Sequence, residues 1–190
     1  METVVLKGFD RLQRAMSAPR VRRLLRKNVG MQIRRATETL RLNVNRYIET
    51  ERHGIPNSPL TILAKGSSKP LVDRGDLRQG IETDHHEGPR SIVGQVGVSR
   101  TRRKKGGGKL INVALSLHEG TTVKVTEEVR KAVFAAIRER TGKSVKFDGK
   151  GGSKTWRIRG RPFIRVPFEE YLPMAKRRIQ LGIKRTIEEL

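Results

Sequence analysis

A helical repeat of apolar residues between Val21 and about Glu51 constrains the fold of this chain more than any other feature. The repeat consists of Leu24, Leu25, Val29, Ile33, Ala36, Leu40, Val44, Tyr47 and Ile48. It predicts one α-helix roughly 45 Å long, because each helical residue adds about 1.5 Å. Gly30 lies inside the repeat and costs about 1 kcal/mol relative to alanine, so a bend near Asn28 to Gly30 is an alternative.

A shorter helical repeat precedes this one in the chain. Its apolar positions are Val5, Phe9, Leu12 and Met16, and they predict a short amphipathic helix. We expect that helix to end before Pro19, because proline lacks a backbone donor and disfavours helix at the residue before it. Between Arg11 and Arg35 there are nine basic residues and no acid, which favours a docking surface over a merely solvated face.

The charge of the chain points to an anionic partner. Lys and Arg number 42 against 19 Asp and Glu, which gives a formal net charge of +23. A chain with this excess repels itself and favours a polyanion, above all nucleic acid, or an acidic protein surface. The alternative is a basic surface that serves solubility alone.

Several classes of protein are disfavoured by what the chain lacks. It has no cysteine, so it can form neither a disulfide framework nor a thiolate nucleophile. Its first residues do not resemble a secretory signal, because an acid stands at the second position and no long apolar core follows. The longest apolar run, 132–137, is far too short to span a bilayer, so we expect no membrane partner.

Alternating apolar residues after the first third of the chain predict strands. Ile92, Val96 and Val98 form one alternating run, and Ile111, Val113, Leu115 and Leu117 form a second. Two half-buried antiparallel strands are the natural interpretation. Val145 and Phe147 could likewise face Trp156 and Ile158 across a second hairpin.

Two further helices are predicted from their end signals. The middle helix has Thr126 as a candidate N-cap, two acids in its first turn and Gly142 after its last turn. The C-terminal helix carries Leu172, Ala175, Ile179, Ile183, Ile187 and Leu190 at helical spacing. Pro173 predicts that this helix begins at or near that residue.

These elements together predict an α+β fold. We expect an antiparallel sheet of about four to five strands, packed by the long N-terminal helix, the middle helix and the C-terminal helix, with basic glycine-rich loops. The expected organisation is a single domain, 1–190, with a helical part at 1–51, a long loop at 52–75 and an α+β core at 76–190.

Two basic glycine-rich segments are the candidate binding sites for DNA or an acidic partner. The first spans 100–109 and the second spans 146–154. Their candidate residues are Arg100, Arg102, Arg103, Lys104, Lys105, Lys109, Lys146, Lys150 and Lys154. Such residues can follow a phosphate chain by charge alone. The aromatic content of 4% offers little for base stacking, so we expect sequence-independent binding.

Two motifs of catalytic appearance fail on context. The fragment TGKS at 141–144 lacks the earlier glycine of a phosphate-binding loop, because Ile137 stands there, and a predicted helix precedes it instead of a strand. His85 and His86 lie in a predicted polar turn, where adjacent side chains point in different directions. No other His or Cys repeats their spacing, so we predict neither a metal site nor another cofactor.

Asp73 and Asp76 invite comparison with a paired-carboxylate active site. Paired carboxylates serve hydrolysis when their environments separate their pKa values, and a nuclease is the corresponding hypothesis. A structural role is more economical, in which Asp73 closes the loop, Gly75 supplies a permissive backbone and Asp76 caps a turn. That turn presents Leu77 and Ile81 to the core, and we predict a protein that is not an enzyme.

Three motifs occur in a recognisable order along the chain. They comprise Pro70, Leu71, Asp73, Gly75 and Leu77; then His118, Glu119 and Gly120; then Arg161, Pro162 and Phe163. In this order they resemble the tailed-bacteriophage virion morphogenesis family, the neck and tail-completion or tail-terminator proteins. The second motif departs from the family pattern, because Gly120 follows Glu119 directly without an intervening aromatic residue.

The resemblance implies an α+β protomer that assembles into a homo-oligomeric, hexameric ring at the head-tail junction of the virion. Such a ring caps or completes the tail tube and joins it to the head connector, and it is assembled in the host cytoplasm. The implied partners are the tail tube protein, head-connector or neck proteins, and genomic DNA in the channel. The competing hypothesis is a free, sequence-independent nucleic-acid-binding protein.

Overall fold

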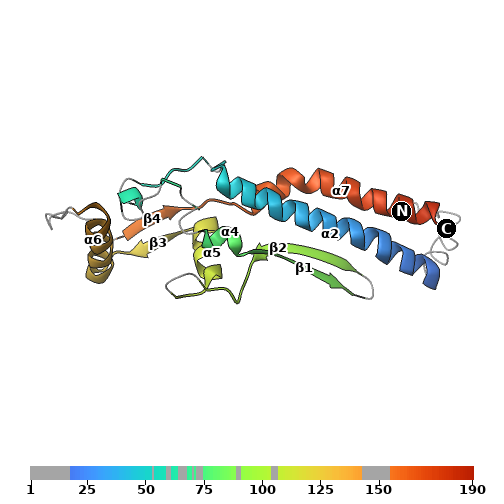
Figure 1. Cartoon of the computed structure of the whole chain (residues 1–190), viewed down its shortest axis with the longest axis horizontal. Coiled ribbons are helices and arrows are strands. Elements are labelled where there is room, and N and C mark those ends of the chain that lie inside the picture. The colour runs from blue at the N-terminus through green and yellow to red at the C-terminus, as the bar shows by residue number, and fades with distance from the viewer. Residues whose placement is uncertain are drawn as a thin grey trace, which may run out of the picture. The chain divides into compact units, whose positions relative to one another are not determined.

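The computed structural model describes residues 18–52, 54–58, 61–63, 68–69, 71, 75–88, 91–103, 107–142 and 155–190. Its elements, in order, are α2 (Pro19–Glu49), α4 (Asp76–Gln79), β1 (Ile81–Glu87), β2 (Ile92–Val98), α5 (Leu110–Glu119), β3 (Gly120–Lys124), α6 (Glu127–Thr141), β4 (Thr155–Arg159) and α7 (Arg165–Glu188) (Figure 1). The chain divides into two compact units: the first draws on residues 1–40, 83–96 and 170–190, and the second on 41–82 and 97–169.

The fold class is α+β, as predicted, but the expected sheet is absent from the described residues. They contain two sheets of two strands each, β1 with β2 and β3 with β4. The prediction of a single sheet of four to five strands is therefore wrong. Its main cause is the run 111–117, whose apolar residues alternate as in a strand but which is helical.

The long N-terminal helix is confirmed as α2. It begins at Pro19, where the missing backbone donor is harmless because the first N–H groups of a helix have no partner within it. Its helical assignment continues unbroken through Gly30. Val44 and Ile48 are fully buried in the second unit, as the apolar repeat predicts. The short helix expected at 5–16 lies outside the described residues.

Within the first unit, α2 and α7 lie side by side and approach closely at Gly182 (Figure 1). A Cβ atom on Gly182 would lie 3.0 Å from the Cα of Val29 and 3.1 Å from the carbonyl oxygen of Asn28. The Asn28 side chain donates from Nδ2 to Thr186 Oγ1 at 3.4 Å and to Glu189 Oε1 at 3.2 Å. Polar side chains therefore link the helices where the glycine lets their backbones meet.

The β1–β2 hairpin was predicted only in its second strand. Ile92–Val98 is a strand, as the alternation predicts. The polar turn predicted around His85 and His86 is wrong, because these residues belong to β1. From Asp84 onward β1 is exposed on both faces, so its sequence carries no period of two. Within the first unit, the Arg34 guanidinium forms a 2.8 Å ion pair with the Glu87 carboxylate.

Helix α5 replaces the predicted second strand. The alternating pattern at 111–117 omitted Leu110 and Ala114, which are four residues apart and are each only 3% exposed. Leu115, which the strand pattern placed in the core, is 54% exposed. The buried positions follow the helical period, so burial of one helical face decides between two periodicities that the sequence permits.

Strand β4 pairs with a strand that the sequence did not reveal. Its partner is β3, in antiparallel register with Gly120 opposite Arg159 and Lys124 opposite Thr155. The pairing that had been expected for β4, with Val145 and Phe147, falls outside the described residues. The ribbon formed by β3 and β4 packs against α5, which leads directly into β3.

The remaining two long helices, α6 and α7, were predicted from the residues at their ends. α6 is confirmed: the Thr126 hydroxyl accepts from the Val129 N–H, and the left-handed Gly142 donates its N–H to the Arg138 carbonyl. α7 begins at Arg165, so the predicted start near Pro173 is wrong. Pro173 lies inside the helix, on an exposed part of it. None of the described helices is long and apolar enough to cross a membrane.

We predict that Gly182→Leu destabilises the protein by about 3 kcal/mol, because the new side chain has to displace the α2 backbone. Leucine is a good helix former, so the loss reflects packing and not helix propensity. The free energy of unfolding in urea measures the effect. Gln180→Leu, which places the same side chain on an exposed position of α7, should change it by less than about 0.5 kcal/mol. Equal losses in both variants would contradict close packing at Gly182.

Candidate functional site

The first of the three motifs leads into α4, and Gly80, directly after α4, packs against the N-terminal end of α5. Leu71 and Leu77 are buried, and a Cβ atom on Gly80 would collide with the Leu110 side chain. Gly75 has φ 77°, as expected of a permissive backbone, and it occupies the N-cap position of α4. Asp76 is the first residue of α4 and its side chain is not the cap, so that detail of the prediction is wrong. Pro70 and Asp73 lie outside the described residues.

The second and third motifs meet at the other end of α5. The Arg161 N–H donates to the Leu117 carbonyl at 2.8 Å. The His118 ring meets the ring of Phe163 edge to face, with centroids 5.2 Å apart. Phe163 is fully buried and Pro162 is half-buried. The structure therefore brings together two motifs that are separated by all of β3, α6 and β4 in the chain.

Two glycines allow two backbone segments to approach very closely at this junction, which we call the backbone crossing. Gly120, at φ 85°, begins β3, and Gly160 follows the end of β4. A Cβ atom on Gly120 would lie 2.6 Å from the Gly160 nitrogen, and one on Gly160 would lie 2.5 Å from the Glu119 carbonyl oxygen. Neither position can accept a side chain without moving the backbone, so the close crossing explains both glycines.

Arg161 is a buried guanidinium that binds backbone carbonyls. It is 6% exposed, and its Nε and Nη2 atoms each donate at 3.2 Å, to Ile55 and Pro56 respectively. Its Nη1 atom lies 3.5 Å from the Arg159 carbonyl. Burial lowers the pKa of Arg161, but arginine stays protonated in proteins. The residue thus ties the 54–58 segment to the end of β4.

The basic segment 100–109 differs from its predicted form. Arg103 and Lys109 form an antiparallel bridge, and the Leu110 N–H donates to the Arg102 carbonyl at 3.0 Å, so the segment closes on itself and leads into α5. The Arg102 side chain pairs with Glu82 at 3.4 Å and donates to the Gln79 carbonyl, which engages it within the protein. Arg100, Arg103 and Lys109 are exposed.

Five of the predicted binding residues cannot be placed. Lys104, Lys105, Lys146, Lys150 and Lys154 lie outside the described residues. Arg100, Arg102, Arg103 and Lys109 can be placed, and all four are exposed basic groups of one segment. The assignment of the binding site to two glycine-rich tips therefore stays a prediction.

The structure adds basic residues that the sequence analysis missed. Arg157 and Arg159 alternate along β4 with Trp156 and Ile158, and both arginines are exposed. Lys124 of β3 is also exposed. We call Thr122, Lys124, Arg157 and Arg159 the basic ribbon face. The alternation within TWRIR is the sequence feature that could have revealed this face, because it places the two arginines on one face of a strand.

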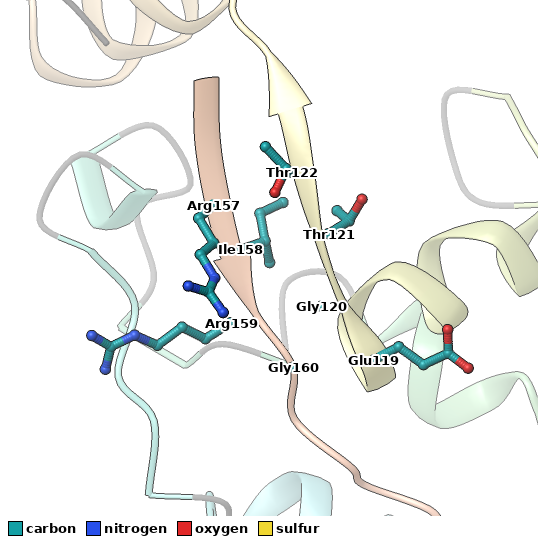
Figure 2. Close-up of a pocket in the computed structure, with 8 residues that line it drawn as sticks. All are labelled: Glu119, Gly120, Thr121, Thr122, Arg157, Ile158, Arg159 and Gly160. Carbon is teal, nitrogen blue, oxygen red and sulfur yellow. The ribbon is translucent and has the colours of Figure 1, made fainter. Parts of the chain in front are cut away.

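A pocket of about 320 Å³ lies on this ribbon (Figure 2). Its lining consists of Glu119, Gly120, Thr121, Thr122, Arg157, Ile158, Arg159 and Gly160. Figure 2 shows both guanidinium groups on the β4 side and the Glu119 carboxylate directed away from them. The arrangement offers positive charge and hydroxyl groups to an anionic ligand.

Metal-dependent chemistry finds no support in the part of the chain that the structure describes. No three His, Asp or Glu side chains there come together in a way that could hold a metal ion. His85 and His86 lie exposed on β1, and the proposed partner of Asp76 lies outside the described residues.

Comparison of the chain with protein-family models, with curated protein sequences and with solved structures found no match.

We predict that Arg161→Lys lowers the free energy of unfolding by about 2 kcal/mol, because an ammonium cannot reach the carbonyls of Ile55 and Pro56 with the same fork of donors. Denaturant unfolding measures the loss. Arg159→Lys, at an exposed position two residues earlier, is the matched control and should cost less than about 0.5 kcal/mol. An Arg161→Lys variant as stable as the parent would refute the stabilising role of the Arg161 hydrogen bonds.

His118 makes the stability of the protein depend on pH. Its Nδ1 atom is buried without a hydrogen-bond partner in the described structure. Burial lowers the pKa of His118, the charge of Arg165 lowers it further, and the charge of Glu119 opposes both effects. A histidine that is harder to protonate in the folded state than in the unfolded chain favours the folded state when it is neutral.

We therefore predict that stability is full above the ordinary His pKa of 6.5 and falls as the pH drops through that value toward the lower pKa of the folded state. Thermal unfolding from about pH 8 to about pH 5 measures this loss. His118→Gln should remove this component of the pH dependence, whereas His86→Gln, on the exposed end of β1, should keep it. A parent and a His118→Gln variant with the same pH profile would count against this role.

Proposed function

We propose that the chain is a structural virion protein of a tailed phage, forming a homo-oligomeric ring at the head-tail junction. The ring caps or completes the tail tube and joins it to the head connector. The observation that carries the proposal is the convergence of the three motifs around α5. The helix α4, which contains Leu77, contacts one end of α5, and His118 and Phe163 meet at the other.

The chemistry of the motif residues supports a structural role. Leu71, Leu77 and Phe163 are buried apolar groups, Gly120 permits a backbone crossing, and Arg161 satisfies loop carbonyls. Each of these residues positions another part of the second unit. Such residues serve a subunit that is used as a building block, for which the shape of the protomer is the functional property.

Exposed apolar residues on α7 support self-association. In the first unit, Leu172, Ile183 and Ile187 of α7 are exposed and lie along one side of the helix, as their separations of eleven and four residues require. An exposed apolar stripe of this kind marks an interaction site. Contacts between subunits of a closed ring would cover it.

The charge of the chain fits the partners that the proposal names. A ring repeats every exposed basic group once per subunit, so weak individual contacts add up to strong binding. Channel DNA and acidic surfaces of the tail tube protein or of head-connector and neck proteins are suitable partners for a chain of net charge +23.

We predict that the purified protein forms closed rings, visible by negative-stain microscopy and as one discrete mass by light scattering. Ile183→Asp combined with Ile187→Asp should reduce the assembly to monomers, because two charges would be buried at the subunit contact. Leu42→Asp, at an exposed leucine of α2, is the control and should leave the rings intact. Circular dichroism checks that every variant is folded.

The decisive observation for this function is made on particles. Phage particles assembled without the chain should accumulate as separate heads and tails, or as tails of irregular length. Normal joined particles in its absence would overturn the proposal. A protein that stays monomeric at every salt concentration would equally argue against a ring.

A second function is favoured by the arginines of the basic ribbon face, which form no ion pair with any described residue. A free, sequence-independent nucleic-acid-binding protein would use them as a monomer. That function predicts tight DNA or RNA binding at low salt that falls steeply at moderate salt, without assembly into rings. The mass measurement above separates the two functions.

A further inference from the structure

We propose that the basic ribbon face binds the phosphodiester backbone of nucleic acid without reading its bases. The site is the pocket along β3 and β4, with Arg157 and Arg159 as the main ligands to phosphate (Figure 2). In the proposed function, this surface makes the contact with DNA. This binding depends on the geometry of the ribbon and holds for a monomer as well as for a ring.

The spacing of the two arginines suits a chain of phosphates. Residues two apart on an antiparallel strand project from the same face at a distance of about 6.8 Å. Neighbouring phosphates of a nucleic-acid strand are separated by a comparable distance, so each guanidinium can engage its own phosphate. Guanidinium groups bind phosphate oxygens through two parallel hydrogen bonds, which makes arginine well suited to this ligand.

The residues opposite the arginines leave room for the ligand and add a donor. Thr122 pairs with Arg157 and carries an exposed hydroxyl, a group that commonly binds phosphate oxygens. Gly120 pairs with Arg159 and has no side chain, which keeps the floor of the pocket open beside that guanidinium. The crossing with Gly160 that excludes a Cβ atom from Gly120 thus also shapes the binding site.

The two arginines form no ion pair with any residue that the structure describes. In the same unit, Arg78 pairs with Glu49 and Arg102 pairs with Glu82. No ion pair between described residues involves Arg157, Arg159 or Lys124. Glu119, the acid in the pocket lining, turns its carboxylate away from them (Figure 2). Among the described residues, this face therefore presents positive charge that an external anion can compensate.

Nucleic acid fits this face better than an acidic protein does. Protein interfaces have an apolar or aromatic core, whereas the apolar side chain in the lining of this pocket is that of Ile158 alone. Trp156 pairs with Val123 and so belongs to the opposite face of the ribbon. Without an aromatic platform for bases, recognition is limited to the backbone, and binding is independent of sequence.

The test compares two pairs of arginines that carry the same charge. Fluorescence anisotropy measures binding of the full chain to a labelled DNA duplex of random sequence over a range of salt concentrations. The test variant is Arg157→Gln with Arg159→Gln. The control is Arg138→Gln with Arg140→Gln, which removes the same charge from exposed positions in the last turn of α6, within the same unit.

Loss of two phosphate contacts should make the slope of log K against log salt shallower by about 1.8, because each contact contributes about 0.9 for duplex DNA. The control variant should bind somewhat more weakly with its slope unchanged. Equal changes in slope for the two variants would overturn the site, since they would show that only net charge matters.

Two further measurements test the role of the guanidinium groups and the choice of ligand. Arg157→Lys with Arg159→Lys keeps the charge and should weaken binding severalfold with the slope retained, which also serves if the glutamine variant fails to fold. Polyglutamate, as a probe for an acidic protein, should compete poorly. Competition as strong as that of unlabelled DNA would overturn the choice of ligand. Ring formation, measured separately for each variant, should be unaffected, so failure here is distinct from failure of the proposed function.

Discussion

The second unit depends on the backbone crossing between Gly120 and Gly160. The crossing fixes where β3 begins relative to the end of β4, and therefore which residues face one another across the ribbon. Arg161 follows directly and secures the crossing by its hydrogen bonds to Leu117, Ile55 and Pro56. A change of one residue in this register would move Arg157 and Arg159 to the opposite face. The contact between Gly120 and Gly160 thus determines both how the ribbon packs and which of its faces carries the two arginines.

Elements with strong local signals could be predicted from the sequence. The cap at Thr126, the glycine at 142 and the long repeat of α2 are each written within a few neighbouring residues, and the structure has them in place. The strand at 111–117 was wrong because its apolar residues satisfy two periods, and the choice depends on what covers Leu110 and Ala114. The early start of α7 was missed because packing tolerates Pro173 inside a helix.

The candidate site was predicted in part. The motif residues Leu77, Arg161 and Phe163 are buried, and Gly120 lies at a close backbone approach, which agrees with residue types that are linked to burial and turn geometry. The ribbon face was missed because it requires the pairing of β3 with β4, which are separated in the chain by α6. Net charge indicated an anionic partner, but charge alone does not say which basic residues are already neutralised, as Arg102 is by Glu82.

The partners of Arg161 have a consequence for how the protein responds to its surroundings. Its hydrogen bonds end on neutral carbonyls in a buried place, where dissolved ions screen weakly and no carboxylate can be titrated. Charges on the exposed ribbon face, by contrast, are screened within about 10 Å at moderate salt. The hydrogen bonds of Arg161 are therefore less sensitive to ionic strength than the charges of the ribbon face. If the ribbon face binds nucleic acid as proposed, a rise in salt concentration would release it without loosening the contact of Arg161 with the 54–58 segment.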